Sequence, residues 1–247
     1  MSSDEALVRD YRAARRDPDL AVLEGFHALK HALRFGAEHL REAVATDPDE
    51  LEDLALALAP DLTGEFRSRV TRVEADLIAR LVPQAPRTGV VAIAGRPLVD
   101  VGAALADGRE APVVLLEEPR TMGNMGACVR VAAAADAAAV LTTGGNDPWH
   151  PDALRGAAGL HFALPVAAVG SLPESDRPLL ALDPEGEPLG ASELPPRAVL
   201  AFGTERHGLS EELLARADAR IGIPMREGVS SLNLATSVAA VLFCGRF

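Results

Sequence analysis

The chain has 247 residues, of which 48% are hydrophobic, and a formal net charge of −12 at pH 7. This hydrophobic content is enough for a packed core, and the length allows one large domain or two modest ones. The acidic balance disfavours binding to nucleic acid through a diffuse basic field, so any such site has to be a local basic patch.

Two further features concern the compartment. No apolar run approaches the ~18–20 residues that a membrane helix needs, and the acidic residues 1–5 do not match a signal peptide. The two cysteines, Cys128 and Cys244, lie in apolar helical contexts, which favours buried thiols over a disulfide framework. We therefore expect a soluble, cytoplasmic protein with no membrane partner.

The first 95 residues alternate between helix and strand patterns. Residues 1–20 predict a short charged helix, residues 21–23 a strand, and residues 26–36 a helix. The acidic run over residues 47–53 predicts the N-terminus of a leucine-rich helix, where acidic groups suit the helix dipole. Residues 70–73 and 90–94 predict strands on either side of a helix over residues 74–81. We expect a small α/β domain over residues 1–95, followed by a connection over residues 96–111.

One face of the helix over residues 26–36 is basic. His27, Lys30, His31 and Arg34 share it at spacings of i, i+3, i+4 and i+7. This face is a candidate for contact with RNA phosphates, and a solvated helix face is the alternative. The two histidines also have the spacing of metal ligands, but no Glu or Cys accompanies them, so we expect no metal.

The second half alternates strands and helices more regularly. Residues 113–116 form an apolar run without alternation, as in a parallel sheet that is buried on both faces. Further strands are predicted over residues 140–143, 164–169, 179–182, 198–202 and 219–223, with helices over residues 124–138, 152–158, 210–217 and 232–243. This order predicts a mostly parallel sheet covered by helices.

Three polar, glycine-containing loops follow strands of this predicted sheet. They cover residues 119–130, 202–210 and 223–236, and ligands of such sheets bind at the carboxyl ends of the strands. Ser230 or Ser231 is a suitable N-cap for the last helix. The loops contain neither the Gly-x-Gly-x-x-Gly of a dinucleotide fold nor a P-loop.

Single residues in these loops leave alternatives open. Asn124 suits a helix cap, and Glu205 suits a cap for the helix that follows it. Arg130 lies in an otherwise apolar helix, where a guanidinium needs a partner such as a carboxylate or a phosphate. Asn233, just inside the last helix, is a poor interior helix residue, which suggests a role for its amide.

Taken together, the three loops resemble the motifs of the SpoU/TrmH family of SPOUT-class RNA 2′-O-ribose methyltransferases. The motifs match residues 124–130, residues 202–205 with 208–210, and residues 223–225 with 231–233. The resemblance covers nearly the whole chain, and residues 22–92 are similar, more loosely, to the family's substrate-binding domain, which is akin to a ribosomal protein. It implies an α/β fold with a C-terminal SPOUT domain over residues 112–247, tied in a deep trefoil knot.

The resemblance also implies S-adenosylmethionine as cofactor, structured rRNA or tRNA as substrate, and a homodimer with each active site at the subunit interface. The implied cofactor-binding residues are Thr142, Gly144, Phe202, Gly203, Thr204, Gly208, Ile223, Pro224, Met225 and Leu232. The implied catalytic positions are Arg130, Asn124, Glu205, Ser231 and Asn233.

A ribose hydroxyl is a poor nucleophile that has to be aligned and relieved of its proton. Arg130 matches the proposed catalytic arginine of the family, as a general base or as a clamp on a substrate phosphate. A reference pKa of about 12.5 makes the base role demanding, which favours the clamp.

Two departures from the family pattern are a later glycine, Gly228, in the third motif and the lack of an acidic residue near the end of the last helix. Neither removes a catalytic residue type. The alternatives are an RNA-binding protein with a vestigial cofactor pocket and an unrelated nucleotide-binding α/β enzyme.

Overall fold

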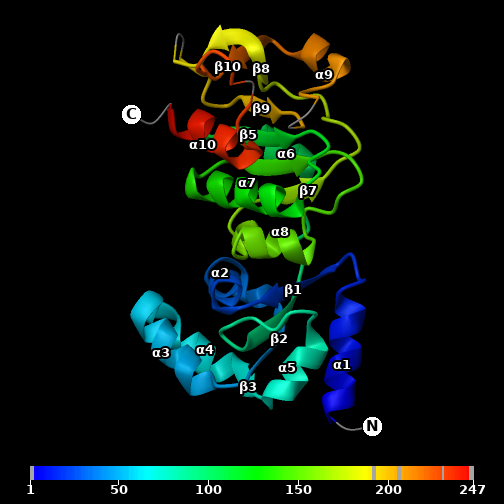
Figure 1. Cartoon of the computed structure of the whole chain (residues 1–247), viewed down its shortest axis with the longest axis vertical. Helices are drawn as coiled ribbons and strands as arrows, with labels where there is room; N and C mark the ends of the chain where they lie inside the picture. Colours follow the sequence, from blue (N-terminus) through cyan, green and yellow to red (C-terminus); the bar gives the residue numbers. More distant parts are fainter. Residues whose placement is uncertain (1–2, 191–192, 205–206, 230, 245–247) are drawn as a thin grey trace. The chain divides into compact units, whose positions relative to one another are not determined.

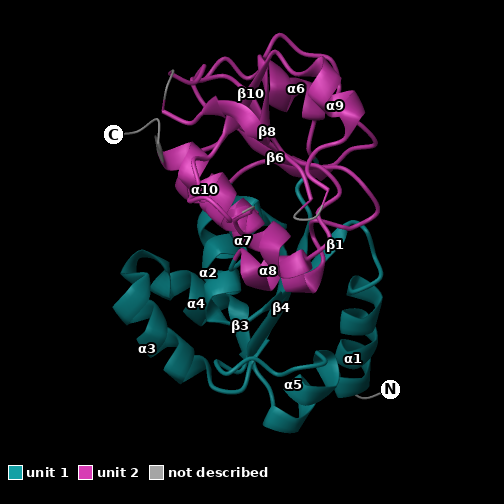
Figure 2. Cartoon of the chain, turned by 45° about the horizontal axis from the view of Figure 1, so that its top comes forward, with its two compact units in different colours: residues 1–98, 158–163 teal, residues 99–157, 164–247 magenta. Residues whose placement is uncertain are grey.

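The computed structural model describes residues 3–190, 193–204, 207–229 and 231–244. The chain divides into two compact units, which Figure 2 shows in different colours. Unit 1 consists of Met1–Leu98 and Ala158–Ala163, and unit 2 consists of Val99–Ala157 and Leu164–Phe247. Unit 1 is thus built from two separate pieces of the chain.

Unit 1 contains a four-stranded sheet in the order β1-β4-β2-β3, in which β4 is antiparallel to both neighbours and β2 is parallel to β3. Its elements (Figure 1) are α1 Ser3–Ala14, β1 Leu20–Glu24, α2 Phe26–Gly36, η1 Ala37–His39, β2 Leu40–Ala45, α3 Pro48–Leu58, η2 Pro60–Leu62, α4 Thr63–Arg69, β3 Val70–Arg72, α5 Ala75–Leu81, β4 Val90–Gly95 and η3 Leu160–Phe162.

One hydrophobic core cluster of unit 1 lies where α1 and α5 pack on the sheet. Tyr11 of α1 is fully buried, and its hydroxyl donates to the Val91 carbonyl oxygen of β4 at 3.1 Å. Burial raises the pKa of the Tyr11 phenol, and the nearby Glu42 carboxylate raises it further. Asp47 caps α3 by accepting from the backbone N–H groups of Asp49 and Glu50.

The second piece of unit 1 lies against α2. Gly159 has φ +75°, and a Cβ atom there would lie 2.6 Å from the Ala28 carbonyl oxygen, so only glycine fits without a backbone shift. Nδ1 of His31 donates to the Ala158 carbonyl oxygen at 2.7 Å. The short segment after α8 therefore completes the surface of α2.

Unit 2 is a parallel six-stranded sheet in the order β10-β8-β9-β5-β6-β7. Its elements are α6 Val101–Ala106, β5 Val113–Leu116, α7 Met122–Ala134, β6 Ala139–Thr142, α8 Pro151–Gly156, β7 Val166–Ala168, β8 Leu179–Pro188, β9 Val199–Phe202, α9 Glu211–Arg216, β10 Ala219–Gly222 and α10 Leu234–Cys244. Every residue of β5, β6 and β9 is buried, as expected for apolar strands covered on both faces.

Small residues allow the helices of unit 2 to pack closely. A Cβ atom at Gly126 of α7 would overlap the Ala153 backbone of α8, and one at Gly156 would lie 2.8 Å from the Gly123 carbonyl oxygen. Helix α10 runs beside α7 in both views (Figures 1 and 2). The helix of small residues predicted from residue 124 is thus in contact with two neighbouring helices.

The predicted α/β class and the parallel sheet of the C-terminal part are confirmed, but several details differ. The range 96–111, predicted as a connection, contains α6, whose Ala104 and Leu105 belong to the core of unit 2. Strand β2 and helix α4 were not predicted. Strand β8 continues to Pro188, beyond the predicted residue 182.

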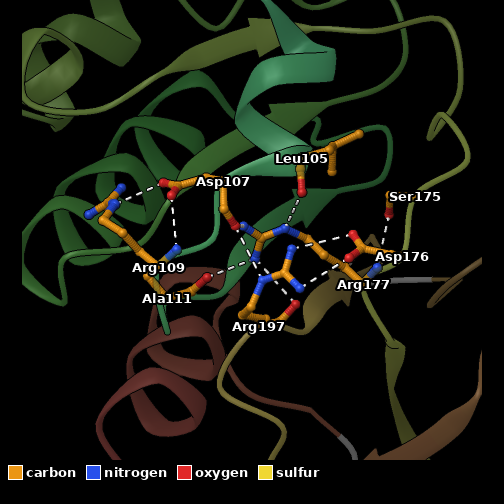
Figure 3. Close-up of polar contacts among 8 residues, drawn as sticks. All are labelled: Leu105, Asp107, Arg109, Ala111, Ser175, Asp176, Arg177 and Arg197. Carbon is orange, nitrogen blue, oxygen red and sulfur yellow. Dashed lines mark hydrogen bonds and ion pairs between the residues drawn. The ribbon is translucent and has the colours of Figure 1, made fainter.

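A buried arginine, Arg177, donates hydrogen bonds to the backbone of the segment at the end of α6 and after it (Figure 3). The side chain of Arg177 is 4% exposed and donates to the carbonyl oxygens of Leu105 at 2.7 Å, Ala111 at 2.8 Å, Asp107 at 2.8 Å and Arg197 at 3.2 Å. Burial lowers the pKa of Arg177, and the neighbouring Arg197 guanidinium lowers it further. The guanidinium thus satisfies backbone acceptors that no strand pairing satisfies.

Candidate functional site

The loops at the carboxyl edge of the unit 2 sheet are tied to one another. Glu117, directly after β5, accepts from the backbone N–H and the hydroxyl of Ser210, at 2.7 and 2.6 Å. On the other side, the side-chain amide of Asn146 donates to the Pro119 carbonyl oxygen at 2.8 Å. The first predicted loop is therefore held between the loops that follow β9 and β6. The sequence did not single out Glu117, although its place at a strand end was visible.

A cavity of about 380 Å³ opens between the second and third predicted loops. Four of the predicted cofactor-binding residues of the second loop line it, namely Phe202, Gly203, Thr204 and Gly208. Ile223, Met225, Ser231 and Leu232 line it from the third loop, with Leu234 and Ser237 of α10 beside them. The structure thus brings together two segments that the sequence predicted to act together.

Backbone hydrogen bonds close the second loop on itself. The N–H groups of Thr204 and Gly208 donate to each other's carbonyl oxygens, both at 3.0 Å. Gly203 lies so close to the Gly208 backbone that an added Cβ atom would overlap it, and Gly208 itself has φ +65°. Glu205, a predicted catalytic residue, lies outside the described residues.

One wall of the cavity comes from a segment that the sequence analysis missed. The pairing of β8 with β10 shifts register between Arg220 and Ile221, so residues 182–186 leave the ladder. Leu182, Asp183 and Pro184 of this excursion line the cavity, and Asp183 pairs with Arg220 at 3.3 Å. The Asp-Pro-Glu-Gly composition directly after an apolar strand was the signal that could have revealed it.

Helix α10 begins later than predicted, and this changes the role of Asn233. Oδ1 of Asn233 accepts from the backbone N–H groups of Ala235 and Thr236 at 3.0 and 3.4 Å, so Asn233 is the N-cap and not an interior residue. Its Nδ2 donates to Oδ1 of Asn124 in α7 at 3.1 Å. Ser231 is exposed and lies before the cap, so the predicted N-cap role of Ser231 is wrong; Ser230 lies outside the described residues.

Arg130 is an exposed residue on α7, six positions after Asn124. It is not among the residues that line the cavity of its own chain. Within the described part of the chain, no hydrogen bond or ion pair holds its guanidinium. Of the two partners that the sequence allowed for this arginine, a carboxylate is not found among the described residues, so a phosphate is the partner that we carry forward.

Three predicted cofactor residues do not line the cavity. Thr142 is fully buried at the end of β6, Gly144 is exposed with φ +85°, and Pro224 is exposed between two lining residues. A Cβ atom at Gly144 would lie 3.2 Å from the Glu118 Cα atom, so this glycine permits the close approach of the loops after β5 and β6.

All three loops, including the two that meet at the cavity, lie within the range that a known family matches. The model of the SpoU rRNA Methylase family matches residues 111–243, which is more than half of the chain. This chain belongs to the SpoU family.

Individual SpoU relatives extend the likeness beyond the matched range. An uncharacterized tRNA/rRNA methyltransferase of Mycobacterium tuberculosis is 34% identical over 75% of this chain and 68% of that protein. A 23S rRNA (adenosine(1067)-2′-O)-methyltransferase of Streptomyces azureus is 25% identical over 94% of this chain and 87% of that protein. The SpoU methyltransferase AviRb of Streptomyces viridochromogenes, crystallised with AdoMet, has the same fold, with a TM-score of 0.77 at 22% identity over 99% of this chain and 97% of that chain.

The basic face predicted on α2 of this SpoU chain is only partly available. His27 is exposed and Lys30 is half-buried, but Arg34 forms a two-pronged ion pair with Asp61 at 2.7 and 2.8 Å. Burial lowers the pKa of His31, whose Nδ1 already donates to Ala158. No helix among the described residues is both long and apolar enough to cross a membrane.

Proposed function

We propose that this SpoU protein transfers a methyl group from S-adenosylmethionine to a ribose 2′-hydroxyl of rRNA or tRNA. The observation that carries the proposal is the cavity between the loop after β9 and the loop before α10, which contains the second and third family motifs. Family membership and the names of the relatives, which include tRNA/rRNA methyltransferases and a 23S rRNA 2′-O-methyltransferase, support the same activity.

The residues of the cavity fit this cofactor. Its volume lies within the range of small-molecule sites, and Leu209, Leu214 and Ile223 offer apolar surface for an aromatic base. The close packing of Gly203 against the Gly208 backbone keeps this loop folded back on itself beside the cavity. When bound, the cofactor supplies a methyl group on a positively charged sulfur, which is a good leaving group.

We assign positioning of the substrate to Arg130. Its exposed guanidinium, which no described residue holds, suits a phosphate of the RNA, since a planar guanidinium binds phosphate oxygens through two parallel hydrogen bonds. Held in this way, the ribose hydroxyl lies in a fixed orientation, and positioning of this kind contributes much of the acceleration of a two-substrate reaction.

The remaining predicted residues have supporting roles in this proposal. The bond between Asn233 and Asn124 couples the start of α10 to α7, next to Ser231 at the mouth of the cavity. We assign to Glu205 a role in ordering the cofactor loop. Thr142, Gly144 and Pro224 shape the loops around the cavity, and His27 with Lys30 on α2 contributes to RNA binding.

We also propose a homodimer in which Arg130 of one subunit serves the cavity of its partner. The motive is that Arg130 is exposed and does not line the cavity of its own chain. A deep trefoil knot in residues 112–247 is part of the same proposal, with residues 1–95 binding RNA and residues 96–111 joining the two parts. The path of the chain from β10, at the edge of the sheet, back to α10 beside α7 supports a threaded path.

The decisive experiment measures incorporation of a labelled methyl group into RNA and maps it by resistance of one nucleotide linkage to alkaline cleavage. The wild type forms the resistant linkage, Arg130→Ala does not, and Gly203→Ala loses affinity for S-adenosylhomocysteine by calorimetry. Cofactor binding without transfer to total cellular RNA would indicate an RNA-binding protein with a vestigial site, and preferential binding of NAD would exclude the proposal.

Mixed dimers test the arrangement of subunits. Arg130→Ala and Gly203→Ala are each expected to be inactive alone. If Arg130 acts on the partner's cavity, a mixture of the two variants regains activity, because one intact site forms in each mixed dimer. A mixture that stays inactive, with dimers confirmed by light scattering, contradicts this arrangement.

A further inference from the structure

A basic groove lies in unit 1 where α1 and α5 run side by side (Figures 1 and 2). Its volume is about 600 Å³, and Arg9, Arg12, Arg16 and Arg80 line it, with Glu5 as the only acidic lining residue. We call it the arginine groove. All four arginines are exposed. In a protein with a net charge of −12, four guanidinium groups around one hollow form a local positive surface.

Arg9 pairs with Asp10 at 2.9 Å, but the other three arginines of the groove keep their charge unpaired within the described part of the chain. Arg12, Arg16 and Arg80 have no hydrogen bond or ion pair with any residue that the structure describes. Elsewhere in the unit, Arg67 pairs with Glu52, Arg69 with Glu65, and Arg72 with Asp49. In these three ion pairs the carboxylate largely cancels the charge of the arginine. The three unpaired arginines of the groove instead present their positive charge to solvent, where an anionic ligand can reach it.

The groove comes from the helical spacing of α1 and from a second helix. Arg9 and Arg12 are three residues apart and therefore lie on neighbouring turns, about 4.5 Å apart along the axis. Arg16 follows the end of α1, and Arg80 reaches the same hollow from α5. Val8 and Ala13 form an apolar floor between these cations. Cations on both walls of an open groove suit an extended polyanion better than a single phosphate ion.

We propose that the arginine groove binds the phosphate backbone of the RNA substrate. The inference rests on the proposed function, which requires an RNA partner, and it assigns a binding surface that the sequence analysis did not. Guanidinium groups bind phosphate oxygens through paired hydrogen bonds. Release of counterions from the RNA makes such contacts favourable and strongly dependent on salt. The groove thus supplies the local basic patch that an acidic protein needs in order to hold RNA.

The test compares two triple variants that remove the same charge from the same unit. The first is Arg12→Gln/Arg16→Gln/Arg80→Gln in the groove, and the control is Arg67→Gln/Arg69→Gln/Arg72→Gln. The probe is fluorescein-labelled fragments of deproteinised ribosomal RNA, titrated by anisotropy at several salt concentrations. The groove variant is expected to bind about tenfold or more weakly and to lose about 2–3 from the slope of log affinity against log salt, since three phosphate contacts are removed. The control keeps an affinity and a slope close to those of the wild type.

Calorimetry with S-adenosylhomocysteine separates this inference from the proposed function. The groove variant should bind it as the wild type does, because the groove residues belong to unit 1 and the cavity residues to unit 2. Equal RNA affinity and slope for the groove variant and the wild type would overturn the inference, as would an equal loss in both triple variants. A groove-dependent RNA affinity in a protein that binds no cofactor would keep the inference and reject the methyltransferase function.

Discussion

Replacing Arg177 by methionine should strongly destabilise unit 2. The substitution keeps much of the apolar volume but removes four donated hydrogen bonds, three of them of 2.8 Å or less, from a side chain that is only 4% exposed. A hydrogen bond from a charged donor contributes about 1.5–3 kcal/mol, so the gross loss for four is large, but water can reach some of the abandoned carbonyl oxygens. We therefore expect a net loss of about 3–5 kcal/mol, as when one partner of a buried charged pair is removed.

Urea unfolding followed by the fluorescence of Trp149 is the assay. This is the only tryptophan of the chain, and it is buried in unit 2, where its Nε1–H donates to the Val166 carbonyl oxygen. Arg197→Met is the matched control, because Arg197 lies beside Arg177 but is partly exposed and pairs with Asp176 at the surface (Figure 3). A midpoint for Arg177→Met that is no lower than that of the control would refute the view that the carbonyl contacts, and not the charge alone, stabilise this segment.

Three further predictions concern single side chains. In Tyr11→Phe the buried Val91 carbonyl oxygen loses the hydrogen bond from the Tyr11 hydroxyl. The free energy of unfolding, measured by thermal denaturation, should therefore decrease by about 1–2 kcal/mol, and an unchanged melting temperature would contradict this. Asn233→Ala removes the N-cap of α10 and its hydrogen bond to Asn124 of α7, and it should lower the free energy of unfolding by about 1 kcal/mol. Asn124→Ala leaves the cap in place and should lower it by less. The reverse order in chemical denaturation would reject the cap assignment. Because burial lowers the pKa of His31 in the folded state, the unfolded chain takes up this proton first as the pH falls below about 6.5, and stability decreases there. In His31→Gln the melting temperature should therefore decline less between about pH 7 and pH 5, and an identical decline would show that His31 does not contribute.

The fold was predictable where the sequence pattern is local. Residues 26–36 and 113–116 have the bounds that the pattern predicted, because an amphipathic stripe and an unbroken apolar run each define one type of element. Strand β2 was missed because residues 40–45 contain charged side chains at Arg41 and Glu42, and its strand pairing comes from distant neighbours, β4 and β3. Helix α6 was missed because it is short and its glycine and alanines resemble those of a connection.

The candidate site was predictable to the extent that motifs lie at strand ends. The two loops that form the cavity could be named from glycines and family resemblance, and the structure places them together. At the wall near Asp183, the local composition signals an irregularity, but the register shift itself depends on the pairing with β10, which is distant in sequence. The exposure of Arg130 could not be inferred from its apolar neighbours in sequence, because adjacent residues on a helix face different directions.

Because Ala158–Ala163 completes unit 1 from within the sequence of unit 2, no single cut releases both halves intact. A fragment that ends at Leu98 would lack the strip that lies on α2, leaving Ala28 and His31 facing water. A fragment that begins at Val99 would contain residues 158–163 without the α2 residues on which they pack. Transplanting unit 1 of this chain onto another protein therefore requires two grafted stretches, residues 1–98 and the six residues 158–163.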